Sequence, residues 1–339
     1  MFFKNVAIEA VAYELPPHII RSVEIENQLS ETVNRFKMQQ GFIEGLTGIR
    51  ERRFWDPGIQ PSDVATLAAE KVIEKAGIDP SMIGCMVSTS VSKDYIEPSV
   101  ASIVHGNLKL PSDCINYDIG NACLGFLNGM SVIGMMIDQG MIDYGLIVDG
   151  ESSREVVEST IAFLNRPETG PDVLRDHFAT LTLGSGAVAM ILGRKDRSNT
   201  GHSLNGAVTK AATQHARLCL GQRDHMIADA SKVLIFGVAL AKETWEIACH
   251  TLENWSDASL DLFVPHQVSQ RNMEVLTDKL NLEIEKFHLN FYTLGNIGPA
   301  ALPITLAQAE EEGYAYPGAH VALMGIGSGL NCSMMSVSW

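Results

Sequence analysis

Apolar runs of strand length alternate with amphipathic helical stretches along most of this chain. Residues 82–90 form one such run and residues 145–149 another, and a long apolar stretch that begins at Cys123 lies between them. Ahead of the first run, apolar side chains recur every three or four residues over residues 62–76, and Gly77 follows as a stop signal. Parallel strands joined by helices give this alternation, so we expect an α/β fold.

The second half of the sequence repeats the alternation. A helical pattern covers residues 230–252, a short strand pattern follows at residues 261–264, and further helices are expected after Ser269 and after Pro299. A glycine turn at residues 325–329 then separates two final strands. A length of 339 residues also favours two subdomains over one simple core. We therefore expect two similar α/β halves.

The boundary between the halves is expected in a polar stretch rich in Arg, Lys, Asp, Ser and Gly, at residues 193–205. This places an N-terminal half at residues 1–195 and a C-terminal half at residues 204–339. Both halves are expected to contribute residues to one active site.

Three other stretches have their own predictions. Residues 22–38 predict one surface helix with Ser22 as its N-cap. Residues 151–180 are charged and contain prolines and a glycine, which predicts a partly helical excursion that covers a pocket. Residues 181–192 then predict a return to the sheet as a strand.

The charge and the apolar pattern exclude two kinds of partner. The net charge is −15, and no basic block exceeds the cluster of Arg50, Arg52 and Arg53, so no nucleic-acid surface is expected. The most apolar segment, residues 123–137, is interrupted by polar residues and falls short of the roughly 20 residues that a membrane span needs. We predict a buried helix there and no membrane span.

The six cysteines predict a reduced, cytoplasmic protein. They contain no Cys-x-x-Cys pair and lie mostly in apolar surroundings. The first residues lack the pattern of a secretory signal. We interpret five of the cysteines as inert core residues, namely Cys85, Cys114, Cys219, Cys249 and Cys332.

One cysteine, one histidine and one asparagine lie in contexts that suit chemistry on thioesters. Cys123 follows small residues at a strand-to-helix junction, where a helix N-terminus and a nearby histidine lower the pKa of a thiol. His266 lies at the carboxyl end of a predicted strand, where α/β sheets place ligand groups. Asn296 lies in a glycine-rich loop. Each is weak evidence alone, but together they predict a nucleophile with two donors for an enolate or oxyanion.

Four motifs are similar to those of the ketoacyl-ACP synthase III enzymes of the thiolase superfamily. They are Thr-Gly-Ile-Arg-Glu-Arg at residues 47–52, Ala-Cys-Leu-Gly-Phe at 122–126, Val-Pro-His-Gln at 264–267, and Gly-Asn followed by Pro-Ala at 295–300. The motifs occur in family order over nearly the whole chain. The resemblance implies the duplicated, five-layered α/β/α/β/α fold of that superfamily and a homodimer. It implies no metal and no cofactor other than the coenzyme A thioesters that serve as substrates.

Further runs resemble the OleA-type enzymes of this superfamily, which condense long-chain acyl-CoA molecules in bacterial olefin biosynthesis. These runs lie at residues 90–99, 148–151, 295–300 and 325–333. The resemblance implies an acyltransferase that joins two long-chain acyl-CoA molecules head to head in a non-decarboxylative Claisen condensation. Hydrolysis from coenzyme A would then give a 2-alkyl-3-oxo acid.

Glu97 distinguishes this reaction from the ketoacyl-ACP synthase III reaction. Those enzymes carry an aromatic residue before the matching proline and obtain their carbanion by decarboxylating malonyl-ACP, whereas a carboxylate can remove an α-proton. By resemblance, Glu97 is the base and reaches the active site from the partner subunit. The backbone amides of Cys123 and Ser328 form the oxyanion hole, and His266 and Asn296 stabilise the enolate. Without the resemblance, Glu97 would be interpreted as facing solvent.

The residues that bind coenzyme A are not assigned. Ketoacyl-ACP synthase III enzymes use a tryptophan and an arginine just before their Thr-Gly-Ile-Arg run, and this chain has Phe42 and Leu46 there, although Arg50 is kept. Arg271 matches a basic position that faces the carrier protein in that family. We expect it to be solvated in an enzyme that uses free acyl-CoA.

Three alternatives stay open at the level of sequence. A decarboxylative synthase would take acyl-CoA and malonyl-ACP and release carbon dioxide. A Cys-His-Asn hydrolase is disfavoured because no papain-type Cys-Gly-Ser-Cys-Trp signature is present. A non-catalytic subunit is disfavoured because all three candidate residues are kept. A hydrolase or reductase that receives the product is a conceivable partner enzyme.

Overall fold

The computed structural model describes residues 1–339, and one mixed sheet of nine strands runs through both halves of the molecule. The strands of the first half are β1 (Val6–Glu14), β4 (Ile83–Ser88), β5 (Ile115–Asp118), β6 (Tyr144–Glu151) and β7 (Gly186–Arg194). Those of the second half are β8 (Ser203–Ala211), β11 (Leu262–Pro265), β12 (His320–Gly327) and β13 (Asn331–Ser338). Their order in the sheet is β11-β12-β13-β8-β1-β7-β6-β4-β5. The halves meet where β1 pairs with β8, and β5 lies at one edge.

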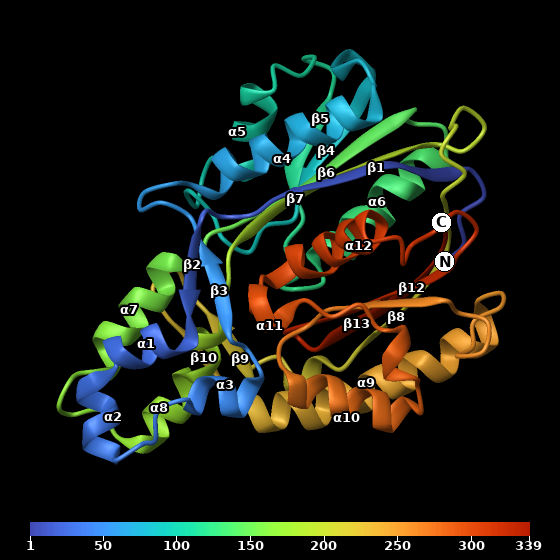
Figure 1. Cartoon of the computed structure of the whole chain (residues 1–339). Coiled ribbons are helices and arrows are strands. Elements are labelled where there is room, and N and C mark those ends of the chain that lie inside the picture. Colours follow the sequence, from blue (N-terminus) through green and yellow to red (C-terminus); the bar gives the residue numbers. More distant parts are fainter.

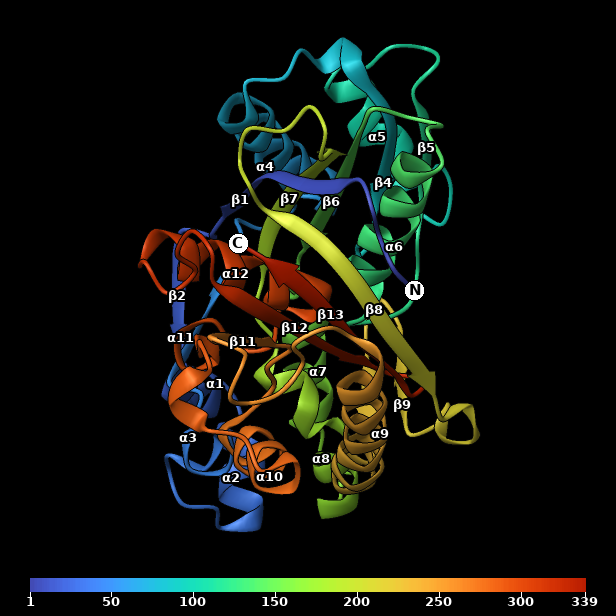
Figure 2. The same cartoon turned by 90° about the vertical axis from the view of Figure 1, so that its right-hand side faces the viewer.

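Helices cover both faces of each group of strands, which gives five layers in the order α/β/α/β/α (Figure 1). From the top of Figure 1 to the bottom, the three helical layers are α4 (Pro61–Ala76) with α5 (Val100–Asn107), α6 (Gly125–Asp138) with α12 (Ala301–Glu311), and α9 (Ala230–Thr251) with α10 (Gln270–Leu280). Figure 2 shows the same order from a direction turned by 90°. The predicted fold class is therefore confirmed.

Three hydrophobic clusters fill the spaces between these layers. The largest packs α6 and α12 between the two groups of strands and contains Phe126, Ile304 and Leu323. The other two lie under the outer helices, one beneath α4 and α5 and one beneath α9 and α10. The middle layer is tightly packed, because a Cβ atom at Gly325 of β12 would lie 2.5 Å from Cδ1 of Leu127 in α6. Only a glycine allows that approach without movement.

Most predicted elements are present with small shifts at their ends. The helix predicted at residues 62–76 is α4, and Gly77 ends it in the left-handed conformation with φ 64°. The predicted strand at 181–192 begins later, at Gly186, because residues 178–182 form a 3₁₀ helix. The proposed boundary between the halves falls in the turn between β7 and β8, and the division into two domains stays a prediction.

A small helical lobe packs beside the layers, at the lower left of Figure 1. It consists of β2 (His18–Arg21), α1 (Ser22–Gln28), α2 (Ser30–Phe36), α3 (Phe42–Thr47), β3 (Glu51–Phe54), α7 (Arg154–Leu164) and α8 (Pro171–His177). The hairpin of β9 (Cys219–Gly221) and β10 (Met226–Ala228) contacts it, and a one-turn helix, α11 (Phe291–Leu294), lies against β3. The excursion predicted at residues 151–180 is thus partly helical, as expected.

The prediction of one helix over residues 22–38 is wrong. Two helices, α1 and α2, occupy this stretch, and Leu29 separates them. The N-cap is Arg21, and Ser22 is the first helical residue. Its hydroxyl is buried and donates a hydrogen bond to the carbonyl oxygen of Ile49 at 2.5 Å, so it serves tertiary packing instead of capping.

Candidate active site

A cavity of about 1610 Å³ opens between the layers and the helical lobe. Ligand pockets commonly measure about 300 to 1,000 Å³, so this one has room for more than one small molecule. Cys123, His266, Asn296 and Ser328 all lie on its wall. The structure therefore brings four of the five predicted site residues together, although Cys123 and Ser328 are more than two hundred positions apart in the sequence.

Cys123 lies in a tight turn between β5 and α6. Ala122 immediately before it has a left-handed backbone with φ 46°, which is unfavourable for a residue with a Cβ atom. The amide of Leu124 donates to the carbonyl oxygen of Asn121 at 3.0 Å, and α6 begins two residues after Cys123. A Cβ atom at Gly125 would lie 2.8 Å from the carbonyl oxygen of Thr89, so this glycine lets the turn press against β4.

The expected activation of the thiol is not present in the free chain. Burial raises the pKa of the Cys123 thiol to about 12, and the neighbouring Cys219, Glu151 and Asp149 add to the shift. The prediction that a helix terminus and a histidine lower this pKa is therefore wrong, because desolvation and nearby acids dominate. Cys123 is a neutral thiol near pH 7.

His266 follows β11 at the carboxyl end of the strand, as predicted. Its backbone amide donates to the carbonyl oxygen of Met324 at 2.8 Å, which fixes the residue beside β12. The ring atom Nδ1 is buried and has no hydrogen-bond partner. Burial lowers the pKa of His266 to about 4, so the imidazole is neutral near pH 7.

Asn296 is held by its backbone and oriented by its own side chain. Its amide donates to the carbonyl oxygen of Thr182 at 3.0 Å, and its carbonyl oxygen accepts from the amide of Gly184 at 2.9 Å. The side-chain oxygen Oδ1 accepts from the amide of Gly298 at 3.0 Å. The side-chain nitrogen Nδ2 is then the group that is left to donate to a ligand.

The glycine turn after β12 packs directly against the turn that carries Cys123. A Cβ atom at Gly327 would lie 3.0 Å from the amide nitrogen of Leu124 and 3.3 Å from that of Cys123. Ser328 follows at once and lies on the same cavity wall. The end of β12 thus packs closely against the turn that carries Cys123.

Sequence reasoning missed two buried carboxylates at the end of β6. Asp149 and Glu151 are both buried, and burial raises the pKa of each above its usual range. One oxygen of Asp149 accepts from the hydroxyl of Thr89 at 2.5 Å, and the other has no partner. The sequence could have indicated them, because Asp149 and Glu151 are the only acidic residues in a strand that is otherwise apolar.

Glu97 does not reach the cavity of its own chain. It lies on the loop between β4 and α5, where its side chain is exposed. Tyr95 and Ile96 from this loop lie on the rim of the cavity, and Ile96 is fully exposed at 102%. The structure of one chain thus leaves this carboxylate apart from the other four residues.

The prediction of five inert core cysteines needs correction in part. Cys219 is partly exposed at the cavity and Cys249 is exposed, whereas Cys85, Cys114 and Cys332 are buried, although Cys332 also borders the cavity. Arg52 of the arginine cluster is fully buried and donates to the carbonyl oxygen of Leu181 at 3.1 Å.

The coenzyme A contacts of this chain stay unassigned. Leu46 is exposed at the cavity, whereas Phe42 packs against the ring of Phe178 with centroids 6.2 Å apart. Arg271 is exposed and forms only a long ion pair with Glu274 at 3.8 Å.

No group of three His, Cys, Asp or Glu side chains is placed to hold a metal ion. None of the helices combines the length and apolarity that crossing a membrane requires.

Comparison with known proteins identifies the class and then the family. Residues 117–210 match the family 3-oxoacyl-[acyl-carrier-protein] synthase III, and residues 251–339 match the C-terminal part of that family. The fold is thus that of a condensing enzyme of this class. Within it, the chain belongs to the OleA family of acyl-CoA:acyl-CoA alkyltransferases, as its full-length relatives show.

Those relatives match the whole chain. The acyl-CoA:acyl-CoA alkyltransferase of Xanthomonas campestris is 41% identical and that of Shewanella oneidensis 40% identical, each over 100% of both chains. A crystal structure of Xanthomonas campestris OleA gives a TM-score of 0.97 over 100% of both chains. Another, with bound lauric acid and lauroyl-CoA, also gives 0.97, over 99% of this chain and 100% of that one. A beta-ketoacyl-[acyl-carrier-protein] synthase III from Natranaerobius thermophilus is only 26% identical.

Proposed function

We propose that this chain condenses two long-chain acyl-CoA molecules head to head, without decarboxylation, to a 2-alkyl-3-oxo acid. The observation that carries the proposal is the single large cavity on whose wall Cys123, His266, Asn296 and Ser328 meet. Full-length similarity to acyl-CoA:acyl-CoA alkyltransferases supports the same reaction. The distant likeness to ketoacyl-ACP synthase III makes decarboxylative condensation the weaker alternative.

The first half-reaction transfers an acyl group to Cys123. Its sulfur attacks the thioester carbonyl while neutral His266 accepts the thiol proton, which then leaves on coenzyme A. The backbone amides of Cys123 and Ser328 donate to the oxyanion, which the close packing of their two turns supports. The products are an acyl-cysteine and free coenzyme A.

The second half-reaction joins the chains. Glu97 of a second copy removes an α-proton from the second acyl-CoA, and His266 and Asn296 donate to the enolate oxygen. The resulting carbanion attacks the acyl-cysteine carbonyl and expels the Cys123 thiolate, which takes a proton back from Glu97. The immediate product is a 2-alkyl-3-oxoacyl-CoA, and water then releases the free acid.

A homodimer is part of this proposal. Glu97 belongs to an exposed loop tip with the large apolar side chains of Tyr95 and Ile96, and such exposure favours burial against another surface. The edge strand β5 lies close to this loop and has a free side in the sheet. A second copy seated on this face would receive Glu97 and cover the edge.

The proposed reaction determines which cofactors, which downstream enzymes and which cell compartment the protein requires. It needs no metal and no cofactor beyond the coenzyme A of its substrates. The 3-oxo acid product is a substrate for a reductase or, as its thioester, for a hydrolase, in the biosynthesis of olefins or related long-chain hydrocarbons. We place the protein in the cytoplasm, where acyl-CoA is available.

Incubation of the purified protein with one long-chain acyl-CoA, followed by mass spectrometry of the products, tests the proposal. The expected product is the coupled 2-alkyl-3-oxo acid, and Cys123→Ala and Glu97→Ala should each abolish it. A coupled product from both variants at the wild-type rate would exclude the mechanism. Carbon dioxide release with malonyl-ACP, and no coupled product from acyl-CoA alone, would establish the decarboxylative alternative.

A further inference from the structure

The loop that carries Glu97 has a tip, residues 95–98, and two ends, which we call its stems and which several contacts hold in place. No hydrogen bond within the chain involves residues 95–98. The tip therefore depends for its position on the residues before and after it. Its first stem comprises residues 90–94, and its second stem is the start of α5 at residues 99–101.

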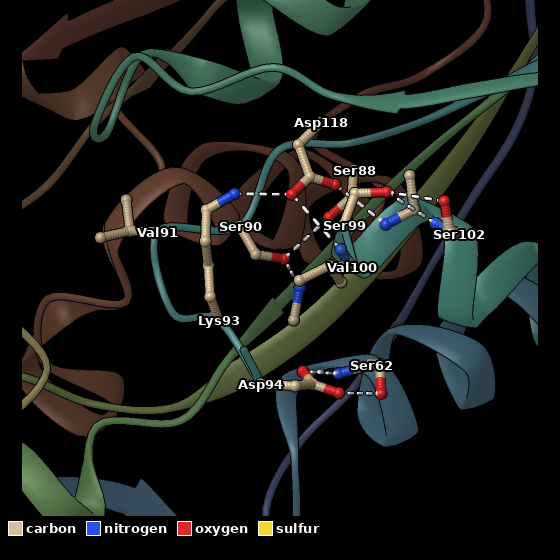
Figure 3. Close-up of polar contacts among 12 residues, drawn as sticks. Ser62, Ser88, Ser90, Val91, Lys93, Asp94, Ser99, Val100, Ser102 and Asp118 are labelled. Carbon is tan, nitrogen blue, oxygen red and sulfur yellow. Dashed lines mark hydrogen bonds and ion pairs between the residues drawn. The ribbon is translucent and has the colours of Figure 1, made fainter. Parts of the chain in front are cut away.

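Several contacts hold the first stem alone. Asp94 accepts from the backbone amide of Ser62 at 3.0 Å and also from its hydroxyl (Figure 3). Glu151 accepts from the amides of Val91 at 2.6 Å and Ser92 at 3.2 Å. These contacts fix where the loop leaves the sheet, but they do not set the distance between its stems.

Asp118, the last residue of β5, contacts both stems. Its Oδ2 atom pairs with Nζ of Lys93 on the first stem at 2.6 Å, as Figure 3 shows. Its two oxygens also accept from the amides of Val100 at 3.3 Å and Ala101 at 2.9 Å on the second stem. The Asp118 side chain is only 16% exposed, so its contacts with the two amides are sheltered from solvent, whereas Lys93 is 42% exposed and its ion pair is partly screened.

We propose that Asp118 is a positioning residue for Glu97, because it fastens together the two stems between which Glu97 projects. The inference rests on the proposed role of Glu97 as a base that enters the site of a second copy. A base must be held within hydrogen-bond reach of its proton, and a misplacement of about 1 Å can cost about a hundredfold in rate. Asp118 does not line the cavity, so it acts through the loop and not on substrate.

The experiment uses mixed dimers in which only one kind of site is complete. Cys123→Ala and Glu97→Ala chains are combined, so that the working site takes its cysteine from one chain and its glutamate from the other. Asp118→Ala is then added either to the chain that supplies Glu97 or to the chain that supplies Cys123. Condensation product is measured by mass spectrometry, and acylation by the stoichiometric release of coenzyme A.

Asp118→Ala on the chain that supplies Glu97 should lower the condensation rate about 10- to 100-fold and leave acylation unchanged. On the chain that supplies Cys123 it should leave both steps near their starting rates. A merely structural defect would not show this asymmetry. Equal losses in the two arrangements, or no loss in either, would overturn the inference.

Three controls make the result decisive. Lys93→Met breaks the same ion pair without altering β5. Because Lys93 lies on the cavity wall of its own chain, this variant is placed only on the chain that supplies Glu97, where it should lower condensation by a smaller factor even where Asp118→Ala folds poorly. Asp113→Ala removes an exposed acid from the segment before β5 and should change neither step. If the parent mixture without Asp118→Ala shows no condensation, the shared site itself is wrong, and this inference falls with the proposed function.

Discussion

Cys123 lies in surroundings that oppose its ionisation. Burial is the main cause of its raised pKa, and the neighbouring Cys219, Glu151 and Asp149 add to the shift. With a neutral thiol and a neutral imidazole, the resting site avoids two buried charges, which would be costly in a medium of low dielectric constant. We expect that, once acyl-CoA is bound, Cys123 loses its proton in the same step in which its sulfur forms a bond to the thioester carbonyl carbon.

Alkylation of Cys123 should therefore depend on pH without a plateau in the neutral range. Because the thiol pKa is about 12, the thiolate fraction increases about tenfold for each pH unit from pH 7 to pH 10. Iodoacetamide labelling of Cys123, followed by peptide mass spectrometry, measures this rate. A plateau below pH 9 would show that the thiolate is already formed in the free enzyme.

Glu151 should make folding stability fall as the pH rises. Burial raises its pKa from 4.5 to about 7, so the folded chain holds a proton that the unfolded chain releases. The resulting stabilisation is fully present below pH 4.5 and is lost as the pH rises through about 7. Urea unfolding at pH 5 and pH 7.5 should show a larger loss of stability for the wild type than for Glu151→Gln. Equal losses would contradict the assignment.

At the scale of elements, the end of β12 and the turn before α6 can pack closely because Gly327 has no side chain. Gly327→Ala would place a Cβ atom 3.0 Å from the amide nitrogen of Leu124, and backbone cannot yield as a flexible side chain can. We expect the two turns to separate and the burst of coenzyme A release to slow about 10- to 100-fold. Gly45→Ala, with open space around its Cβ position, is the matched control and should acylate normally.

The elements themselves were largely predictable, because buried strands and one-sided helices have different periods. The break at Leu29 was not, since apolar side chains keep helical spacing across it and neither glycine nor proline marks it. The strand β7 begins later than predicted because residues 178–182 form a 3₁₀ helix, and Leu181 of this helix packs into the hydrophobic cluster of the lobe.

The residues that share the cavity wall were predictable from sequence, but their electrostatics were not. Cys123, His266 and Asn296 stand in local motifs, so their types and spacing were readable from the sequence. The pKa of Cys123 depends on Glu151 and Cys219, which are distant in sequence and become neighbours only through the fold. A motif identifies a nucleophile, whereas the surrounding tertiary structure decides its protonation.

At the scale of the whole molecule, the proposed sharing of one site between two copies predicts complementation. Cys123→Ala and Glu97→Ala should each be inactive alone, yet random pairing gives mixed dimers in half of the cases, each with one complete site. Condensation in an equal co-expressed mixture should thus recover to about a quarter of the wild-type rate. Activity in the mixture no higher than in either variant would place all catalytic residues within one chain.

Ile96 is fully exposed at the loop tip in the single chain, so the proposed pairing of two copies would bury it only when they associate. If the proposed dimer forms, then below its dissociation constant the number of paired copies increases with the square of protein concentration. The condensation rate should then increase with the square of protein concentration, whereas the rate of Cys123 acylation should stay proportional to protein concentration. In such solutions the ratio of acylated enzyme to coupled product reports how much of the protein is paired.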